Sequence, residues 1–178
     1  CNVIGFFSNF YNTVNTLRGL PIYNDPNEIP LDAQWIVGSG NPQAIINMVE
    51  TVATYIKPAT AIIHNSCVLG SNINIGDGTI ICPGTIITCD VTIGCNTVIN
   101  LSCTIGHDCQ IGSNVHLSPN VSLSGYSIVG DNSELGTGCV LTPKSEVPAN
   151  SIVGASGVVT KKLLESGTYV GVPVRKIK

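Results

Sequence analysis

The sequence predicts a mainly β protein, a long repetitive β structure that follows a small α/β segment. Two observations support this prediction: a strict six-residue period of aliphatic residues, and a composition poor in aromatic and charged side chains. Aromatic residues make up 5% of the 178 residues and charged residues 11%, alongside 19 glycines. Soluble globular domains carry about 25% charged residues, so this balance is typical of a thin, repetitive β architecture.

The repeat runs from Ile63 to Val159. Its seventeen positions, spaced six residues apart, are all Ile, Leu or Val, and glycine follows eight of them directly. Neither the helical period of 3.6 residues nor the strand period of two gives six. A short strand plus a turn does: the aliphatic side chain points inward, a small residue fills the corner, and Gly or Asn supplies the turn dihedral angles.

The regions on either side of the repeat have a different pattern. Residues 1–57 read as α/β, with expected strands and one helix at Cys1–Phe7, Ile22–Tyr23, Ala33–Val37 and Ala44–Ile56, the helix ended by Pro58. Three strands and one helix are too few for a full parallel-sheet domain, so we expect a chain that begins late in such a domain, or a reduced domain. Residues 58–160 form the repeat. In residues 161–178 we expect a helical turn over 161–165 and a strand over 168–172.

Charge and hydropathy exclude several classes of function. The formal net charge is -3, which gives no basic surface for nucleic acid. Five of the eight basic residues lie from Lys161 onwards. The longest uncharged stretches are interrupted by polar residues and are too polar to span a membrane. We therefore expect a cytoplasmic protein without nucleic-acid or membrane partners.

Of three histidines, His107 is the best candidate for catalysis. It stands two residues after an inward aliphatic position, and Asp108 follows it. An outward-facing histidine beside a carboxylate is suited to general-base chemistry, because the carboxylate fixes the imidazole tautomer. Cys89 stands three hexapeptides earlier at the same repeat position, and nucleophilic acyl transfer through this thiol is a weaker alternative. His64, where the helical segment meets the repeat, is expected to be structural.

The residues around His107 resemble one family, the hexapeptide-repeat acyltransferases that include sialic acid O-acetyltransferases and UDP-4-amino-sugar N-acetyltransferases. The likeness extends over most of the chain. It rests on these segments: Ile4-Gly5-Phe6, Gly40-Asn41-Pro42, Asn100, Gly106-His107-Asp108-Cys109, His116-Leu117-Ser118-Pro119, Ser124-Gly125 and Gly171-Val172-Pro173-Val174-Arg175. The resemblance implies a left-handed parallel β-helix in which three hexapeptides form one triangular coil, with about five and a half coils in all.

The resemblance also implies a reaction and a site. Acetyl-CoA would donate its acetyl group to an amino or hydroxyl group of a sugar, either a nucleotide-linked amino sugar or sialic acid, in bacterial glycan biosynthesis. His107 would be the base and Asp108 would orient it. The cofactor-binding residues would be His116, Gly125, Thr137, Gly154 and Ala155, with the Gly125 N–H steadying the oxyanion. Ser8 and Asn9 stand where the family has an acidic pair that binds the acceptor.

Coils of three hexapeptides have two geometric consequences. His107 and His116 lie half a coil apart, so they converge only in a site shared between adjacent subunits, and we expect a homotrimer. Cys67, Cys103 and Cys139 occupy one corner of alternate coils, about 9.6 Å apart and beyond the roughly 7 Å that a disulfide requires. They are expected to be buried core residues.

Two alternatives remain beside the enzyme. A zinc site of the γ-carbonic anhydrase type needs two histidines five residues apart, whereas the spacings here are 43 and 9, so no metal is expected. A non-catalytic structural β-helix subunit of an assembly has the same aliphatic repeat, but it does not need Gly-His-Asp in an outward turn.

Overall fold

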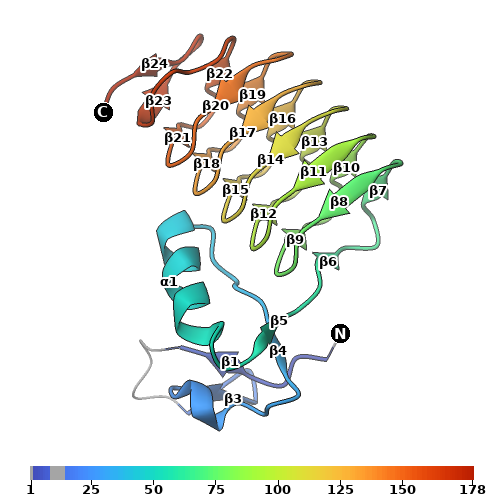
Figure 1. The fold of residues 1–178 in the computed structure, drawn as a ribbon, viewed down its shortest axis with the longest axis vertical. Coiled ribbons are helices and arrows are strands. Elements are labelled where there is room, and N and C mark those ends of the chain that lie inside the picture. The colour runs from blue at the N-terminus through green and yellow to red at the C-terminus, as the bar shows by residue number, and fades with distance from the viewer. Residues whose placement is uncertain (1, 9–14) are drawn as a thin grey trace.

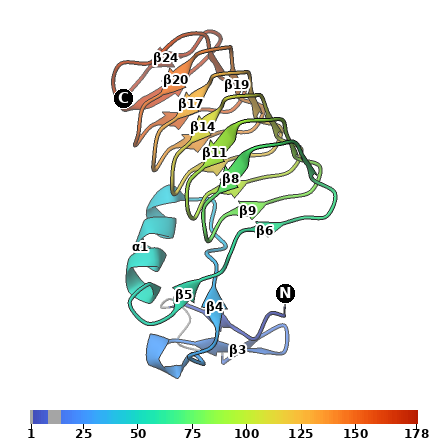
Figure 2. The same ribbon diagram turned by 45° about the vertical axis from the view of Figure 1, so that its right-hand side comes forward.

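The computed structural model describes residues 2–8 and 15–178. A stack of triangular coils rises from a small N-terminal part, and the C-terminus lies at the far end of the stack (Figure 1). Figure 2, turned by 45°, shows the coils edge on, with helix α1 (Pro42–Val52) beside the first of them. The mainly β architecture expected from the sequence is confirmed.

The stack has three flat faces, each a parallel sheet whose strands come from successive coils. Face I contains β6 (Ile62–Ile63), β9 (Ile80–Ile81), β12 (Val98–Ile99), β15 (His116–Leu117), β18 (Glu134–Leu135) and β21 (Ile152–Val153). Face II contains β7 (Val68–Leu69), β10 (Ile86–Ile87), β13 (Thr104–Ile105), β16 (Ser122–Leu123), β19 (Val140–Leu141) and β22 (Val158–Val159). Face III contains β8 (Ile73–Ile75), β11 (Val91–Ile93), β14 (Gln110–Ile111), β17 (Ile128–Val129) and β20 (Glu146–Val147).

The register between coils is constant throughout the stack, at three hexapeptides per coil. Ile99 pairs with Leu117, and Leu117 pairs with Leu135. From Ile81 to Val159 every aliphatic residue of the repeat is at most 3% exposed, so the inward column predicted from the period of six is the core. Seventeen strands from β6 to β22, three to a coil, correspond to the expected five and a half coils.

Small side chains at the corners form hydrogen bonds to backbone carbonyls of the next coil. The Thr79 and Thr97 hydroxyls donate to carbonyls 15 residues later, each at 2.8 Å. The thiols of Cys103 and Cys139 contact the carbonyls of the equivalent residues at 3.3 and 3.0 Å. All seven described cysteines are free, and Cys67, Cys103 and Cys139 fill one corner as expected. Burial raises the pKa of Cys103 to about 11, so this thiol is inert.

The N-terminal part contains two small sheets. One joins β1 (Phe6–Phe7) in parallel to β3 (Leu20–Tyr23), with β2 (Thr16–Leu17) antiparallel to β3. The other is a βαβ unit in which β4 (Gln34–Trp35) and β5 (Lys57–Pro58) pair in parallel on either side of α1. The strands expected at Cys1–Phe7 and Ala33–Val37 are present as the shorter β1 and β4, with Cys1 itself outside the described residues, whereas Ile22–Tyr23 lies in the longer β3. Strands β2 and β5 and the short 3₁₀ helix Pro26–Glu28 were not predicted.

Helix α1 is shorter at its C-terminus than the sequence predicts. It begins at Pro42, where the Asn41 side chain caps it by accepting from the Ala44 N–H at 2.9 Å. It ends at Val52 rather than Ile56, because the next residues leave the helix and lead into β5. The Ile56 carbonyl accepts from the Trp35 indole at 2.9 Å.

Helix α1 packs against the outside of face I. Ile45 is fully buried with Val37 and Val98, and Met48 and Ile80 pack against this cluster. The contact joins the N-terminal part to the outward side chains of β9 and β12. It therefore fixes which face of the β-helix the N-terminal part covers.

At the C-terminal end, the expected helical turn over 161–165 does not form. Lys162 instead bridges to Glu146 in parallel, and the Leu163 N–H donates to the Glu146 carbonyl at 2.8 Å. The chain therefore continues the coil for another corner. The expected strand is present as β23 (Thr168–Val170), which extends face I and pairs with β24 (Arg175–Lys176).

Candidate functional site

His107 lies in the turn between β13 and β14, where face II meets face III. We call the column of turns at this edge the II/III corner; it includes Cys89, His107, Gly125 and Pro143, each one coil above the last. The side chain of His107 is 53% exposed. Its Nδ1 lies 2.8 Å from Oδ2 of Asp108. The predicted His–Asp pair is therefore formed at the surface.

Gly125 lies directly above the imidazole. A Cβ added at Gly125 would stand 2.6 Å from Nε2 of His107 and 2.7 Å from Cε1, so only glycine fits this position with the ring where it is. Among the described residues, the Gly125 N–H donates no hydrogen bond, and Nε2 of His107 has no partner either. A backbone donor and a ring nitrogen, both without a partner among the described residues, thus belong to two residues that pack against each other at the II/III corner.

His116 occupies a different environment. It lies on β15 in face I, the face opposite the II/III corner, and is 9% exposed. Gly40 of the N-terminal part covers it: a Cβ at Gly40 would stand 2.9 Å from Cε1 of His116. The buried Nδ1 has no hydrogen-bond partner. Burial lowers the pKa of His116, partly offset by Glu134 on the neighbouring strand.

The other predicted cofactor residues lie together at a third position. Thr137 and Ala155 stand one coil apart where face I meets face II, and Gly154 precedes Ala155. The Ser156 N–H donates to the Thr137 carbonyl at 2.8 Å, which holds the two turns together. One subunit thus brings Thr137, Gly154 and Ala155 together, and separately His107, Asp108 and Gly125, but it does not join the two groups.

The predicted acceptor residues lie in the N-terminal part. Ser8 follows β1 and its N–H donates to the Tyr23 carbonyl at 3.0 Å. Asn9 lies outside the described residues. Sheet β1–β3 is at the opposite end of the molecule from the C-terminal coils (Figure 1).

The sequence did not single out Tyr126, which also belongs to this site. Its ring centroid lies 5.1 Å from that of His107 with the planes at 88°, an edge-to-face contact. Tyr126 stands one coil and one position after His107. The stacking of successive coils was therefore the signal that could have identified it.

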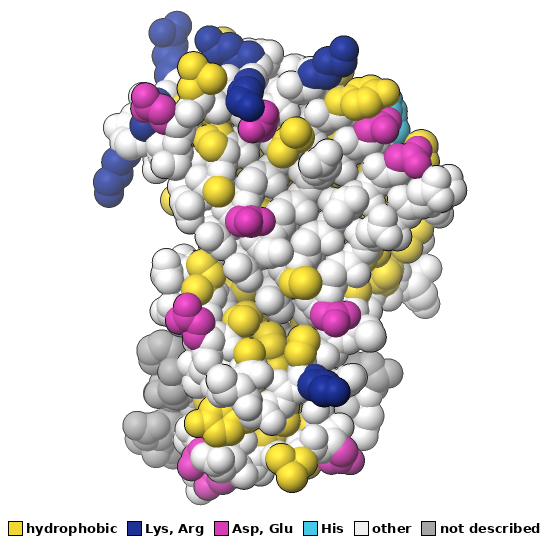
Figure 3. Space-filling model, in the orientation of Figure 1, with side chains coloured by type: hydrophobic (Ala, Val, Ile, Leu, Met, Phe, Trp, Pro, Cys, Tyr) yellow, Lys and Arg dark blue, Asp and Glu magenta, His cyan; other side chains and the backbone are white. Residues whose placement is uncertain are grey.

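A basic pocket lies at the C-terminal end of the stack. It has a volume of about 330 Å³ and includes Lys161, Arg175 and the apolar residues Leu163 and Val174. Of the other three basic residues at this end, two are paired, Lys162 with Glu146 at 2.7 Å and Lys176 with Glu165 at 2.8 Å. Lys and Arg side chains gather at this end in Figure 3. Lys161 and Arg175 have no ion-pair partner in the described part of the chain.

Cys89 is poorly suited to act as a nucleophile. It stands one coil below His107, as predicted. Partial burial, a hydrogen bond to the Asp90 side chain, and the charges of Asp90 and Asp108 all raise the pKa of its thiol. Since the thiolate is the reactive form, these neighbours suppress thiol chemistry at this position.

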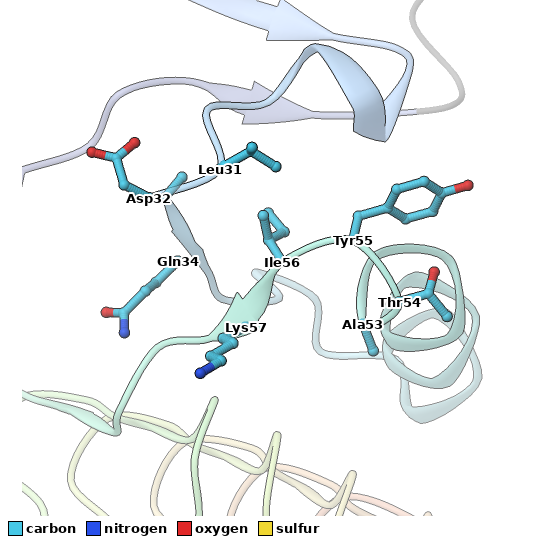
Figure 4. Close-up of a pocket in the computed structure, with 9 residues that line it drawn as sticks. Leu31, Asp32, Gln34, Ala53, Thr54, Tyr55, Ile56 and Lys57 are labelled. Atoms are coloured by element: carbon cyan, nitrogen blue, oxygen red, sulfur yellow. The ribbon is translucent and has the colours of Figure 1, made fainter.

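A larger pocket, of about 500 Å³, lies in the N-terminal part between β4 and the residues after α1 (Figure 4). Asp32, Gln34, Thr54, Tyr55 and Lys57 are its polar lining residues, and none of the predicted site residues lines it. Over residues 2–8 and 15–178, no group of three His, Cys, Asp or Glu side chains is placed to hold a metal ion. In the same residues, no helix combines the length and apolar character needed to cross a membrane.

Comparison with known proteins identifies the repeat. The bacterial transferase hexapeptide (six repeats) family matches residues 90–125, which include His107, Asp108, His116 and Gly125. No curated protein sequence matches the chain.

Solved structures match nearly the whole chain. The acetyltransferase domain of PglB from Neisseria gonorrhoeae is 22% identical, with a TM-score of 0.86 over 94% of this chain and 84% of that one. PerB from Caulobacter crescentus, in complex with CoA and GDP-perosamine, is 28% identical, with a TM-score of 0.85 over 92% and 82%. WeeI from Acinetobacter baumannii is 25% identical, with a TM-score of 0.84 over 97% and 85%.

These likenesses confirm the left-handed parallel β-helix. A further match from Caulobacter crescentus is described as a perosamine N-acetyltransferase, so the neighbours include sugar acetyltransferases. Together with the family match to the repeat around His107, this supports acyltransferase activity in addition to the shared fold. The chain is an acyltransferase whose repeat over residues 90–125 matches the bacterial transferase hexapeptide family.

Proposed function

We propose that the protein transfers the acetyl group of acetyl-CoA to an amino or hydroxyl group of a sugar, a nucleotide-linked amino sugar or sialic acid, with His107 as general base. One observation carries this proposal: Nε2 of His107 lies against Gly125 at one exposed corner, and neither Nε2 nor the Gly125 N–H has a partner among the described residues. A base next to an oxyanion donor is the arrangement that acyl transfer needs.

The reaction follows from these positions. Asp108 accepts from Nδ1–H of His107, which leaves Nε2 free to take the proton of the acceptor N–H or O–H. The acceptor attacks the thioester carbon, and the Gly125 N–H stabilises the oxyanion, typically by about 3 kcal/mol. The C–S bond then breaks, and the CoA thiolate leaves with the proton from Nε2. The acetylated sugar and the CoA thiol are the products.

The basic C-terminal pocket fits the other end of acetyl-CoA. Lys161 lies about three coils above His107, roughly 14 Å along the stack at about 4.8 Å per coil. Together with Arg175 it offers the CoA phosphates two cations without ion-pair partners in the described part of the chain. Replacing Lys161 and Arg175 by alanine is expected to raise KM for acetyl-CoA about tenfold, with kcat within about twofold. An unchanged KM would place the phosphates elsewhere.

We propose further that the site is completed between the subunits of a homotrimer. His107 and Gly125 lie at one corner, Thr137 and Ala155 at another, and His116 on face I, so no single subunit surrounds an acetyl group with all of them. In a ring of three, one corner meets the neighbour's face. The cofactor roles of Thr137, Gly154, Ala155 and His116, and the acceptor roles of Ser8 and Asn9, depend on this assembly. Light scattering with size exclusion measures it.

A His107→Ala variant tests the proposed chemistry. With a panel of free and nucleotide-linked amino- and hydroxy-sugars and thiol release as the readout, turnover is expected to fall by about 10³-fold. His64→Ala is the matched control, because His64 is an exposed turn histidine whose Nδ1 contacts the Ser66 hydroxyl at 2.9 Å, outside the site. The proposal fails if His107→Ala turns over like the wild type, or if no sugar in the panel releases thiol.

A further inference from the structure

Two residues of the II/III corner differ in type from the residues that have a left-handed backbone elsewhere in the β-helix. Twelve described non-glycine residues of the stack have φ between 54° and 64°, and ten of them are Asn, Asp or Ser. Short polar side chains tolerate this left-handed conformation, whereas long and aromatic ones do not. The exceptions are Tyr126, at 62°, and Lys144, at 64°, which stand one and two coils above Asp108. A strained residue beside a reactive group points to a role in function.

The Tyr126 side chain contributes little to the core. It is 51% exposed and lies outside the aliphatic column, so burial does not explain why an aromatic residue occupies a left-handed position. What its ring does contact is the imidazole of His107, edge to face at 5.1 Å. Its N–H also donates to the His107 carbonyl at 2.9 Å, which fixes the two residues to each other.

Three contacts together define where the imidazole lies. Asp108 holds Nδ1, the Gly125 backbone supports the ring from the coil above, and Tyr126 lies against it. The hydrogen bond to Asp108 alone leaves an exposed ring free to pivot about Nδ1. The Tyr126 ring restricts this pivot, which keeps Nε2 against Gly125.

We propose that Tyr126 is a positioning residue for the base: its ring, rather than its hydroxyl, holds the His107 imidazole in the orientation for proton transfer. The inference rests on the proposed function of His107. The left-handed backbone at Tyr126 then lowers the stability of the folded protein. In return, the position of the Tyr126 ring increases catalytic activity.

Tyr126→Asn and Tyr126→Phe test this assignment. Asparagine is the commonest residue at the equivalent turn positions, so Tyr126→Asn is expected to raise Tm. It should lower kcat about tenfold, with both KM values within about twofold, because a displaced base affects the chemical step. Tyr126→Phe keeps the ring and is expected to retain kcat within about twofold.

Lys144→Asn is the matched control. It relieves the same left-handed strain one coil higher, and its amine lies 6.0 Å from the Tyr126 ring without contacting His107. It should raise Tm and leave kcat unchanged. A Tyr126→Asn variant that keeps wild-type kcat, or a Tyr126→Phe variant as slow as Tyr126→Asn, overturns the proposal.

Nuclear magnetic resonance of the histidine ring protons supplies a readout that needs no substrate. The ring current of Tyr126 shifts the His107 signals, so Tyr126→Asn is expected to move them and Tyr126→Phe to preserve them. Unmoved His107 signals in Tyr126→Asn overturn the positioning role even if the protein acetylates no sugar. Shifted signals without any turnover support the contact and count against the proposed function instead.

Discussion

Two histidines half a coil apart are each packed against a glycine, and the two contacts have opposite character. His107 lies beneath Gly125, which belongs to the next coil of the same β-helix. His116 lies beneath Gly40, which belongs to the N-terminal part. The first ring is 53% exposed and the second residue is 9% exposed. A Cβ added to either glycine would overlap the imidazole beneath it.

The partners of the two rings differ as much as their exposure. Nδ1 of His107 is bonded to a carboxylate, whereas Nδ1 of His116 is buried without a partner. Burial lowers the pKa of His116 and so favours its neutral form. A coil of three hexapeptides places positions half a coil apart on opposite sides of the prism. The same residue type is thus available for proton transfer on one side and for packing on the other.

The largest expected effect is that of Gly125→Ala on activity. The new Cβ would stand 2.6 Å from Nε2 of His107, and the exposed ring can swing away. We expect kcat to fall about 100-fold while Tm changes little, because a misplacement of about 1 Å has effects of this order. Gly38→Ala is the control, since no atom lies within 4 Å of its added Cβ. A kcat within about twofold of wild type would show that the ring does not depend on Gly125.

Gly40→Ala should have the opposite profile. The His116 ring is buried and cannot move aside, so the added Cβ is expected to destabilise the protein by about 1–3 kcal/mol, measured by denaturant unfolding. Combining Gly40→Ala with His116→Ala removes the ring that the Cβ meets. The double variant should therefore be less destabilised than the sum of the two single variants. If the losses of stability in the two single variants simply add up in the double variant, the two residues do not interact.

The period of the sequence explains why one contact was predictable and the other was not. Cys89, His107 and Gly125 are separated by whole coils, so the repeat alone places them in one column. Gly40 and His116 are distant in the sequence and belong to different architectures, and no periodicity relates them. Their contact depends on how α1 packs against Val98, which only the folded structure shows.

The two helical segments that the structure contradicts were overridden for similar physical reasons. Helical spacing continues to Ile56, but the pairing of β4 with β5 withdraws the last residues from the helix. The charged run at 161–165 has helical propensity, but Lys162 and Leu163 bond Glu146 in the coil before it. In both places a tertiary hydrogen-bonded strand overrides a local preference.

Asp108→Asn tests the carboxylate side of the His107 contact with a smaller expected effect. Asparagine keeps the shape of the side chain but loses the charge that favours Nδ1–H and stabilises the imidazolium. Since Asp108 is 40% exposed, water screens its charge, and we expect kcat to fall about tenfold with KM unchanged. Asp90→Asn, one coil below, is the control and should leave kcat unchanged. Equal losses of kcat in the two variants would indicate that any negative charge near the corner has the same effect, and not the contact of Asp108 with His107 in particular.

The smallest effect concerns the pH dependence of stability at His116. Its pKa in the folded protein is below the ordinary 6.5. As pH falls through 6.5, the unfolded chain therefore takes up the proton before the folded protein does. The contribution of neutral His116 to stability is complete above this pH and is lost as pH falls toward the folded pKa. His116→Gln stays neutral, so its Tm should fall less than that of the wild type between about pH 7.5 and about pH 5.5. Parallel Tm curves would mean that His116 takes up its proton equally readily in the folded and unfolded chain, and that Gly40 does not keep water from the ring.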